Sequence, residues 1–153
     1  MNVDTIRLMT GISTIWDQLL QASLPAELRH QWSGSHLAIL AALQNGRTLT
    51  MQNLARLIQK DKSTLSVLIR KLETHGFVQR SPDELDRRKC WILSTPKGNR
   101  LYRQYQKAEQ RLTALCDSMQ PIPKDQEAKL QSDLHLLEQR LLQVRSQLAA
   151  IKD

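Results

Sequence analysis

Residues 50–98 constrain the fold of this chain more than any other segment does. Two short helical patterns meet there at a polar turn of residues 59–61. Thr50 and Asp61 precede the two patterns and predict their N-caps. In each pattern, apolar side chains recur at the spacing of one helix face. They are Leu54, Ala55, Leu57 and Ile58, and then Leu65, Leu68, Ile69 and Leu72.

A polar hairpin follows the second helical pattern. Residues 77–80 and 90–93 predict two short strands, joined by a loop of residues 81–89 with Asp86-Arg87-Arg88 at its tip. Thr95-Pro96 then predicts a helix start, because proline fits the first helical position. This order of elements predicts a mostly α fold of the α+β type, a winged helix-turn-helix with a small β-hairpin wing.

Helical patterns also flank this segment. The first has an apolar face of Ile12, Ile15, Trp16, Leu19 and Leu20, and a second helix of about residues 35–44 ends at Asn45-Gly46. Beyond a helix predicted to end near Met119, a heptad seam consists of Leu130, Leu134, Leu137, Leu141, Val144, Leu148 and Ile151.

A seam this narrow buries best against other long helices. These belong either to a partner chain, as a dimer interface, or to a hairpin with the helix before it. If the seam forms a dimer interface, the chain divides into three parts. These are an N-terminal helix within the dimerisation region (1–34), a DNA-binding domain (35–98) and C-terminal dimerisation helices (99–153).

The positive charge of the chain is concentrated in the central segment. The net charge is +7, and residues 50–98 hold ten basic and five acidic side chains, whereas residues 1–49 hold three of each. Neutralising the phosphates of DNA requires such an excess. Charge alone is equally compatible with a role in solubility.

The helix predicted at about residues 62–75 meets the requirements of a recognition helix. Its face opposite the leucine stripe carries short polar side chains that fit a major groove and reach base edges. We predict that Ser63, Thr64, Ser66, Val67 and Arg70 contact bases or phosphates, and that Lys62 and Lys71 contact phosphates. The alternative is an ordinary solvated helix face.

The hairpin tip predicts a minor-groove contact. Arg87 or Arg88 would enter the groove, where the negative potential attracts arginine. Asp86 would orient the guanidinium by a charge-assisted hydrogen bond. The alternative is a charged loop that only keeps the hairpin soluble.

These motifs resemble the MarR family of bacterial transcription regulators. The resemblance lies in the recognition-helix sequence STLSVLIRKLETHG, the D-x-R of the wing and the strand that ends in LSTPKG. Family members usually have L-T-x-x-G at this last position, so Ser94-Thr95 departs from the pattern. By motif the resemblance covers residues 35–100, and by layout it covers the whole chain.

The resemblance implies a homodimer that binds a pseudo-palindromic operator on double-stranded DNA, by family default as a repressor. We expect a cytoplasmic protein, because the sequence has no signal-peptide pattern and no membrane span. Ile12, Ile15 and Leu19 would form the dimer interface, together with the heptad seam from Leu130 to Leu148. A small aromatic or phenolic effector would bind in a cleft near the dimerisation helices, and its binding would release the DNA. Trp16, Trp32 and His36 are candidate lining residues, with ordinary core or surface positions as the alternative, and the effector site is otherwise unknown.

Other functions find less support in the sequence. Two cysteines, Cys90 and Cys116, are too few for a disulfide scaffold and are expected to be inert thiols. The four histidines form no metal motif, so we expect no metal and no cofactor. No phosphate loop or nucleophile–base motif predicts an enzyme, and no apolar run predicts a membrane span. Two alternatives remain, a winged-helix adaptor or antagonist that does not read DNA, and a non-specific architectural DNA binder.

Overall fold

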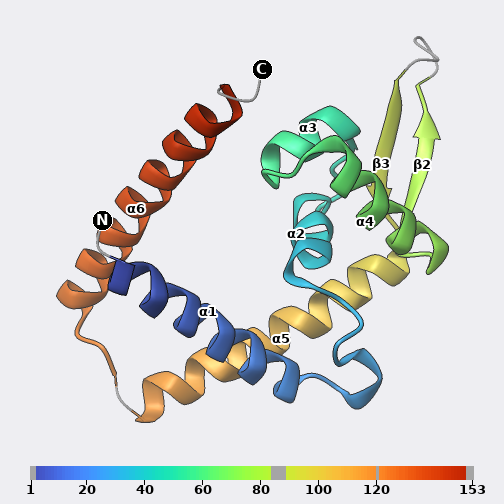
Figure 1. Ribbon diagram of the computed structural model, residues 1–153. Coiled ribbons are helices and arrows are strands. Elements are labelled where there is room, and N and C mark those ends of the chain that lie inside the picture. Colours follow the sequence, from blue (N-terminus) through green and yellow to red (C-terminus); the bar gives the residue numbers. More distant parts are fainter. Residues whose placement is uncertain (1–2, 84–88, 120, 151–153) are drawn as a thin grey trace. The chain divides into compact units, whose positions relative to one another are not determined.

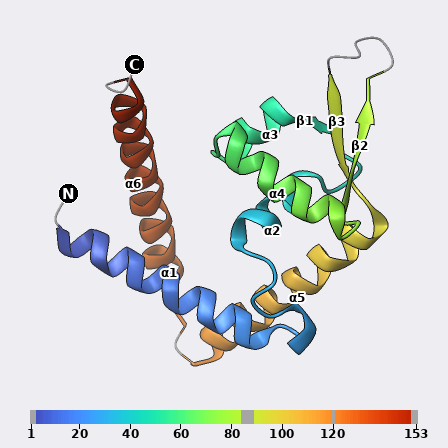
Figure 2. The same cartoon turned by 45° about the vertical axis from the view of Figure 1, so that its right-hand side comes forward.

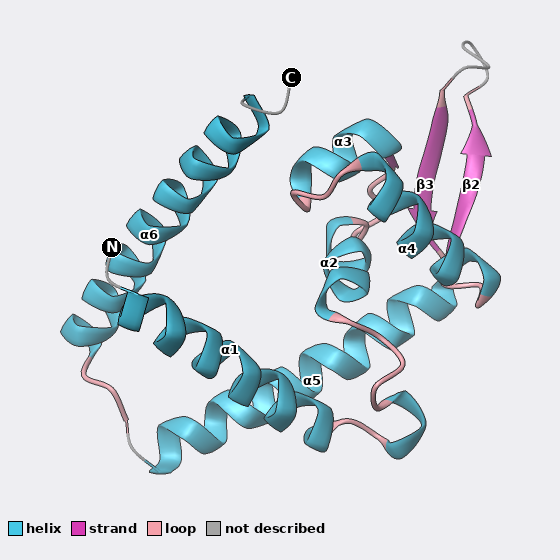
Figure 3. Ribbon diagram, viewed as in Figure 1, coloured by secondary structure: helices cyan, strands magenta, loops and turns pink. Residues whose placement is uncertain are grey.

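The computed structural model describes residues 3–83, 89–119 and 121–150, except for the side chains of residues 145 and 148–150. Most of the described chain is helical, and the strands are confined to one small sheet (Figure 3). The elements are α1 (Val3–Ser23), a short 3-10 helix η1 (Ala26–Leu28), α2 (Gly34–Ala42), β1 (Leu49–Thr50), α3 (Met51–Leu57), α4 (Lys62–Thr74), β2 (Val78–Pro82), β3 (Cys90–Ser94), α5 (Pro96–Met119) and α6 (Lys124–Ala150).

The chain divides into two compact units, Met1–Leu112 and Thr113–Asp153. In the first unit, α2 lies between α4 and α5, and β2 and β3 form a hairpin that extends past α4 (Figures 1 and 2). The second unit holds the end of α5 and the whole of α6. Among the described helices, none combines the length and hydropathy that crossing a bilayer demands.

The sheet is antiparallel, with β3 between β1 and β2. Val78 pairs with Ser94 at one end of the hairpin, and Pro82 pairs with Cys90 at the other. The sequence placed Ser81 and Pro82 in the loop, but both lie in β2. Proline is tolerated there because β2 is an edge strand, where a missing N–H interrupts no inner ladder.

The main core joins α2, α3, α4 and the sheet. Ile39, Leu54, Leu65 and Ile92 each have 0% of their surface exposed within it. The sequence also placed Leu57 on the buried face of α3, but its side chain is 52% exposed. Leu54, Ala55 and Ile58 define the inner face of α3, and the helical spacing places Leu57 at the edge of that face, where solvent reaches it.

A second, smaller core lies where the end of α1 meets α5. Leu20 of α1 and Leu24 just after it pack there with Tyr105, Ala108 and Leu112 of α5. Trp16 is partly buried against this core, whereas Ile12 and Ile15 are both 58% exposed and Leu19 is 45% exposed. In the single chain, α1 therefore keeps most of its predicted dimerisation face in solvent.

Candidate nucleic-acid interface

The turn between α3 and α4 fixes how the second helix is presented. Thr50 accepts a hydrogen bond from the Asn53 N–H at 3.2 Å and so caps α3, as predicted. Gln59 adopts a positive φ of 55° in the turn. The Lys60 N–H then donates to the Ala55 carbonyl at 3.0 Å. These local bonds set the exit from α3 and the entry into α4.

Helix α4 has one fully buried face and one solvent face. Leu65, Ile69 and Leu72 are each 0% exposed, which anchors the helix in the main core. The opposite face is solvent-exposed, and Val67 is 67% exposed there although it is apolar. The predicted contact residues on or beside this face are exposed, except Ser66, which is half-buried: Lys62, Ser63, Thr64, Ser66, Val67 and Arg70.

Lys71 lies apart from these residues, although its side chain is also exposed. Its ammonium donates to the Gln31 carbonyl at 2.7 Å and lies 5.0 Å from the centre of the Trp32 ring. The side chain therefore links α4 to the segment before α2. The sequence predicts that Lys71 contacts a phosphate. In that case its ammonium would bind the phosphate while it also contacts Gln31 and Trp32.

Asp61 caps α4, as the sequence predicted. Its Oδ1 accepts the Thr64 N–H at 2.8 Å, and its Oδ2 accepts the Thr64 hydroxyl at 2.7 Å. The Ser63 hydroxyl also donates to Oδ1. The bond from Ser63 and the two from Thr64 hold the pKa of Asp61 well below its usual range, so the cap is charged at neutral pH.

Bonds at the loop end of the hairpin and an ion pair to α4 hold the hairpin. The Trp91 indole N–H donates to Asp83 Oδ2 at 2.8 Å, and the Asp83 N–H donates to the Lys89 carbonyl at 3.1 Å. Arg80 Nε lies 3.2 Å from Glu73 Oε2, which connects β2 to α4. The predicted minor-groove residues Asp86, Arg87 and Arg88 lie outside the described residues.

A groove of about 540 Å³ separates the start of α3 from β3. It brings together basic side chains from two segments that are far apart in the sequence, Lys62 at the start of α4 and Lys89 beside the wing. Its lining residues are Thr50, Met51, Gln52, Asn53, Lys62, Lys89, Cys90 and Trp91. The sequence did not predict this groove, because it depends on the pairing of β1 with β3.

Comparison with known proteins agrees with this arrangement. The model of the MarR family matches residues 32–90, which include α2, α3, α4 and β2. The winged-helix region of this chain is therefore similar to the MarR family. A curated relative is the uncharacterized HTH-type transcriptional regulator YybA of Bacillus subtilis, 32% identical over 69 residues that cover 45% of each protein. The chain spans about half the length of the curated relatives that it matches.

Solved structures extend the likeness to the fold of nearly the whole chain. FabT of Streptococcus pneumoniae, solved in complex with DNA, has a TM-score of 0.70 and 17% identity, with 92% of this chain and 99% of FabT covered. PcaV of Streptomyces coelicolor, solved with its natural ligand, has a TM-score of 0.70 and 18% identity, with 88% and 89% covered. At these identities, the comparison shows a shared fold.

Within the region that matches the MarR family model, Trp32 and His36 are core residues. Trp32 is 4% exposed and meets the rings of His36, His75 and Phe77 edge-on, with centroids 4.9 to 5.4 Å apart. His36 is 6% exposed. The sequence offered both as lining residues of a ligand cleft, but their rings instead pack the start of α2 against the end of α4.

His36 also closes the N-terminus of α2. Its Nδ1 accepts the Ser33 N–H at 3.3 Å and lies 2.8 Å from the Ser33 hydroxyl. Burial, together with the nearby charge of Lys71, lowers the pKa of His36 below its ordinary value of 6.5. Protonation of Nδ1 would leave the Ser33 N–H without its acceptor. The folded protein therefore favours the neutral ring.

We expect the protein to lose stability in mild acid through His36. The unfolded chain takes up this proton near pH 6.5, whereas the folded chain takes it up only at lower pH. The contribution is therefore fully present above pH 6.5 and declines as the pH falls below it. Urea unfolding at pH 7.5 and pH 5.5 measures this loss, which His36→Gln should reduce, because glutamine keeps the cap but does not titrate.

A matched control for this experiment is His135→Gln on α6. The His135 side chain is 71% exposed and lies 3.6 Å from Glu138 on the same helix, so its replacement removes one histidine without affecting the buried ring and should reduce the loss in acid less than His36→Gln does. An equal reduction in both variants would show that the acid sensitivity does not come from the buried ring.

Proposed function

We propose that this protein is a transcriptional regulator that binds specific sequences of double-stranded DNA as a homodimer. The observation that carries this proposal is the presentation of α4. Its buried face is fixed in the core by three side chains with no exposed surface, while its outer face offers Ser63, Thr64, Val67 and Arg70 to solvent. A rigid helix with short polar side chains on its outer face suits insertion into a major groove.

The surroundings of α4 support the same docking mode. With α4 in the major groove, the groove between α3 and β3 would receive the sugar–phosphate backbone, with Lys62 and Lys89 beside it. The wing loop between β2 and β3, residues 83–89, would reach the adjacent minor groove through Arg87 or Arg88. Hydroxyl and amide side chains of Thr50, Gln52 and Asn53 offer further hydrogen-bonding groups to phosphates.

The exposed apolar helices support the homodimer. Of the side chains described in α6, none is buried, and Leu130, Leu134, Leu141 and Val144 of the heptad seam are 42–49% exposed. Leu137 is half-buried, and the side chain of Leu148 lies outside the described residues. A dimer with two-fold symmetry would place its two α4 helices in successive major grooves, on half-sites about 10 base pairs apart.

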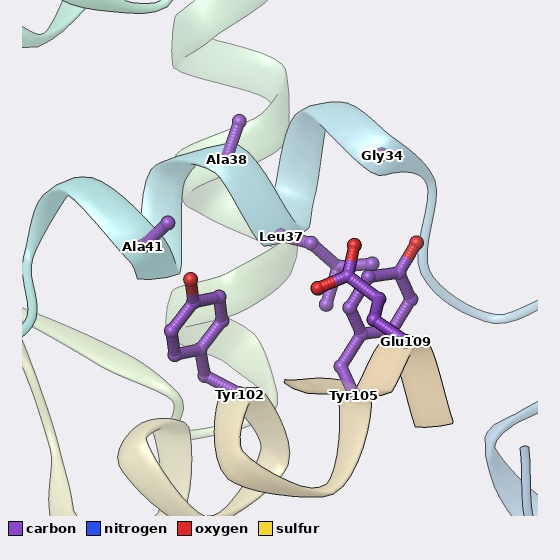
Figure 4. Close-up of a pocket in the computed structure, with 7 residues that line it drawn as sticks. All are labelled: Gly34, Leu37, Ala38, Ala41, Tyr102, Tyr105 and Glu109. Atoms are coloured by element: carbon purple, nitrogen blue, oxygen red, sulfur yellow. The ribbon is translucent and has the colours of Figure 1, made fainter. Parts of the chain in front are cut away.

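A pocket between α2 and α5 supports control by a small effector. Its volume is about 230 Å³, and its lining combines two tyrosines and a carboxylate with small or apolar side chains: Gly34, Leu37, Ala38, Ala41, Tyr102, Tyr105 and Glu109. In Figure 4, Tyr102 and Tyr105 rise from α5 toward α2, and Glu109 lies beside Tyr105. None of the sequence candidates Trp16, Trp32 and His36 lines this pocket.

The chemistry of the pocket suits a small aromatic or phenolic compound. Burial first, and then the charges of Glu109 and Asp17, raise the pKa of Tyr105 to about 12, so its hydroxyl stays protonated and can donate. Burial also raises the pKa of Glu109. Ring stacking on the tyrosines and hydrogen bonds to these two groups would hold the effector, whose binding would release DNA and relieve repression.

Selection of the purified protein against a random pool of duplex DNA tests the proposal. We expect enrichment of an inverted repeat with half-sites about one helical turn apart. Enrichment of no sequence despite salt-sensitive binding would indicate an architectural binder, and no binding at low salt would indicate a protein adaptor. The selected duplex then serves to screen small aromatic and phenolic compounds for release of the DNA.

A further inference from the structure

The two hydroxyls at the start of α4 have their protons committed within the protein. The Ser63 hydroxyl donates to Asp61 Oδ1, and the Thr64 hydroxyl donates to Asp61 Oδ2 at 2.7 Å. Asp61 is ionised at neutral pH because these bonds and the Thr64 N–H lower its pKa. An ionised carboxylate accepts hydrogen bonds and cannot return one.

This arrangement determines whether the two hydroxyls donate or accept a hydrogen bond when they meet a partner outside the protein. A hydroxyl has one proton, so a hydroxyl that donates to Asp61 has only acceptor lone pairs left. Ser63 and Thr64 are both exposed, so these lone pairs can be reached from solvent. Phosphate oxygens are also acceptors. Neither hydroxyl can therefore bond a phosphate while it keeps its bond to Asp61.

The major groove offers two kinds of donor to such a lone pair. These are the 6-amino group of adenine and the 4-amino group of cytosine. Guanine O6 and thymine O4 are acceptors and would repel the hydroxyl oxygen. The nearby Lys62 and Arg70 have only donors, so α4 has groups of both polarities, each suited to different base edges.

We propose that Ser63 and Thr64 read DNA bases as hydrogen-bond acceptors, and that Asp61 is the positioning residue that sets this polarity. This inference rests on the proposed function and specifies the chemistry of its recognition helix. On the strand facing α4, the half-site would have adenine or cytosine opposite these hydroxyls. Guanine and thymine would be disfavoured there, and the two hydroxyls would leave the phosphates to the basic side chains.

Base analogues in the selected duplex test the acceptor role. Each adenine of one half-site is replaced in turn by purine deoxyriboside, which lacks the 6-amino group, and each cytosine by the analogue that lacks the 4-amino group. We expect wild-type affinity to fall about three- to tenfold at one or two positions, the effect of one lost hydrogen bond. At one of these positions, Thr64→Val should no longer distinguish the analogue from the natural base, and Ser63→Ala should behave likewise at its own position.

Thr74→Val is the matched control on the same helix. The Thr74 hydroxyl donates to the Arg70 carbonyl at 2.9 Å, at the far end of α4, so this variant should discriminate the analogues as the wild type does. If Thr64→Val and Ser63→Ala weaken binding to natural and analogue duplexes by the same factor, the hydroxyls do not contact amino groups and the inference is wrong.

Repeating the selection with Asp61→Asn tests the positioning role. Asparagine is also a good N-cap, so α4 should be retained. Its amide offers one acceptor oxygen and a donor nitrogen in place of two acceptors. One hydroxyl would then be free to donate outward, and we expect one half-site position to change from adenine or cytosine to guanine or thymine.

The outcomes separate the inference from the proposed function. An unchanged half-site with Asp61→Asn would overturn the positioning role of the carboxylate. Failure of the wild-type protein to select any sequence would instead overturn the proposed function, and the inference with it.

Discussion

Gly98→Ala is expected to lower the free energy of unfolding of the winged-helix unit by about 3 kcal/mol, at the upper end of the usual cost of overpacking. A Cβ at this position would lie 2.1 Å from the Phe77 carbonyl oxygen and 2.7 Å from Ser94 Oγ. The serine side chain can rotate away, but the carbonyl belongs to the backbone. It also accepts the Thr95 N–H at 3.0 Å, so its movement would break the junction before α5.

Thermal unfolding followed by circular dichroism measures this effect, and the melting temperature should fall by roughly 6 to 12 °C. Gly11→Ala is the matched control, because a Cβ there meets nothing within 4 Å and the residue lies inside α1. Alanine should be neutral or slightly stabilising at that position, since it is the better helix former. Equal melting temperatures for wild type and Gly98→Ala would contradict the close approach of α5 to Phe77.

The helix starts of the winged-helix region were predictable because capping is local. Thr50, Asp61 and Thr95 each accept a backbone N–H from three residues further along the chain. A polar residue before an apolar periodic run therefore carries the signal without any knowledge of the tertiary structure. The start of α5 at Pro96 follows from the same local chemistry.

The features that escaped prediction depend on contacts between distant segments. Strand β1 has only two residues and exists because Leu49 and Thr50 pair with Ile92 and Trp91. The burial of Trp32 against His75 and Phe77 likewise requires the end of α4 to meet the start of α2. The hydrophobic periodicity of a single segment cannot predict which distant segments will contact each other.

The N-terminus of α4 was predicted only in part. The sequence indicated that Ser63 and Thr64 face outward and that Asp61 caps the helix, but treated the two roles as separate. The structure joins them, since both hydroxyls donate to the capping carboxylate. The spacing D-x-S-T contains this information only when side-chain rotamers are considered, because a capping carboxylate has two oxygens and can accept more than the backbone N–H.

Replacing both Leu134 and Leu141 with glutamate in α6 is expected to abolish the proposed dimerisation and with it most of the affinity for the proposed palindromic operator. The two leucines occupy equivalent positions one heptad apart and are 48% and 42% exposed in the single chain. Burying two carboxylates in an apolar interface is strongly unfavourable. Light scattering should then give the mass of one 17.6 kDa chain rather than two. Operator affinity should fall about 100-fold or more, because binding of the second half-site is no longer intramolecular.

Ser132→Glu together with Gln139→Glu is the matched control, because these exposed positions are also one heptad apart but lie opposite the seam. This variant adds the same charge to α6, so general repulsion from DNA affects both proteins equally, and the control should remain dimeric. A dimeric Leu134→Glu, Leu141→Glu protein with wild-type affinity would remove the seam from the interface. A monomer that has also lost helical circular dichroism would favour the other use of the seam, a helical hairpin within one chain, since only an intramolecular contact is needed to fold the helix itself.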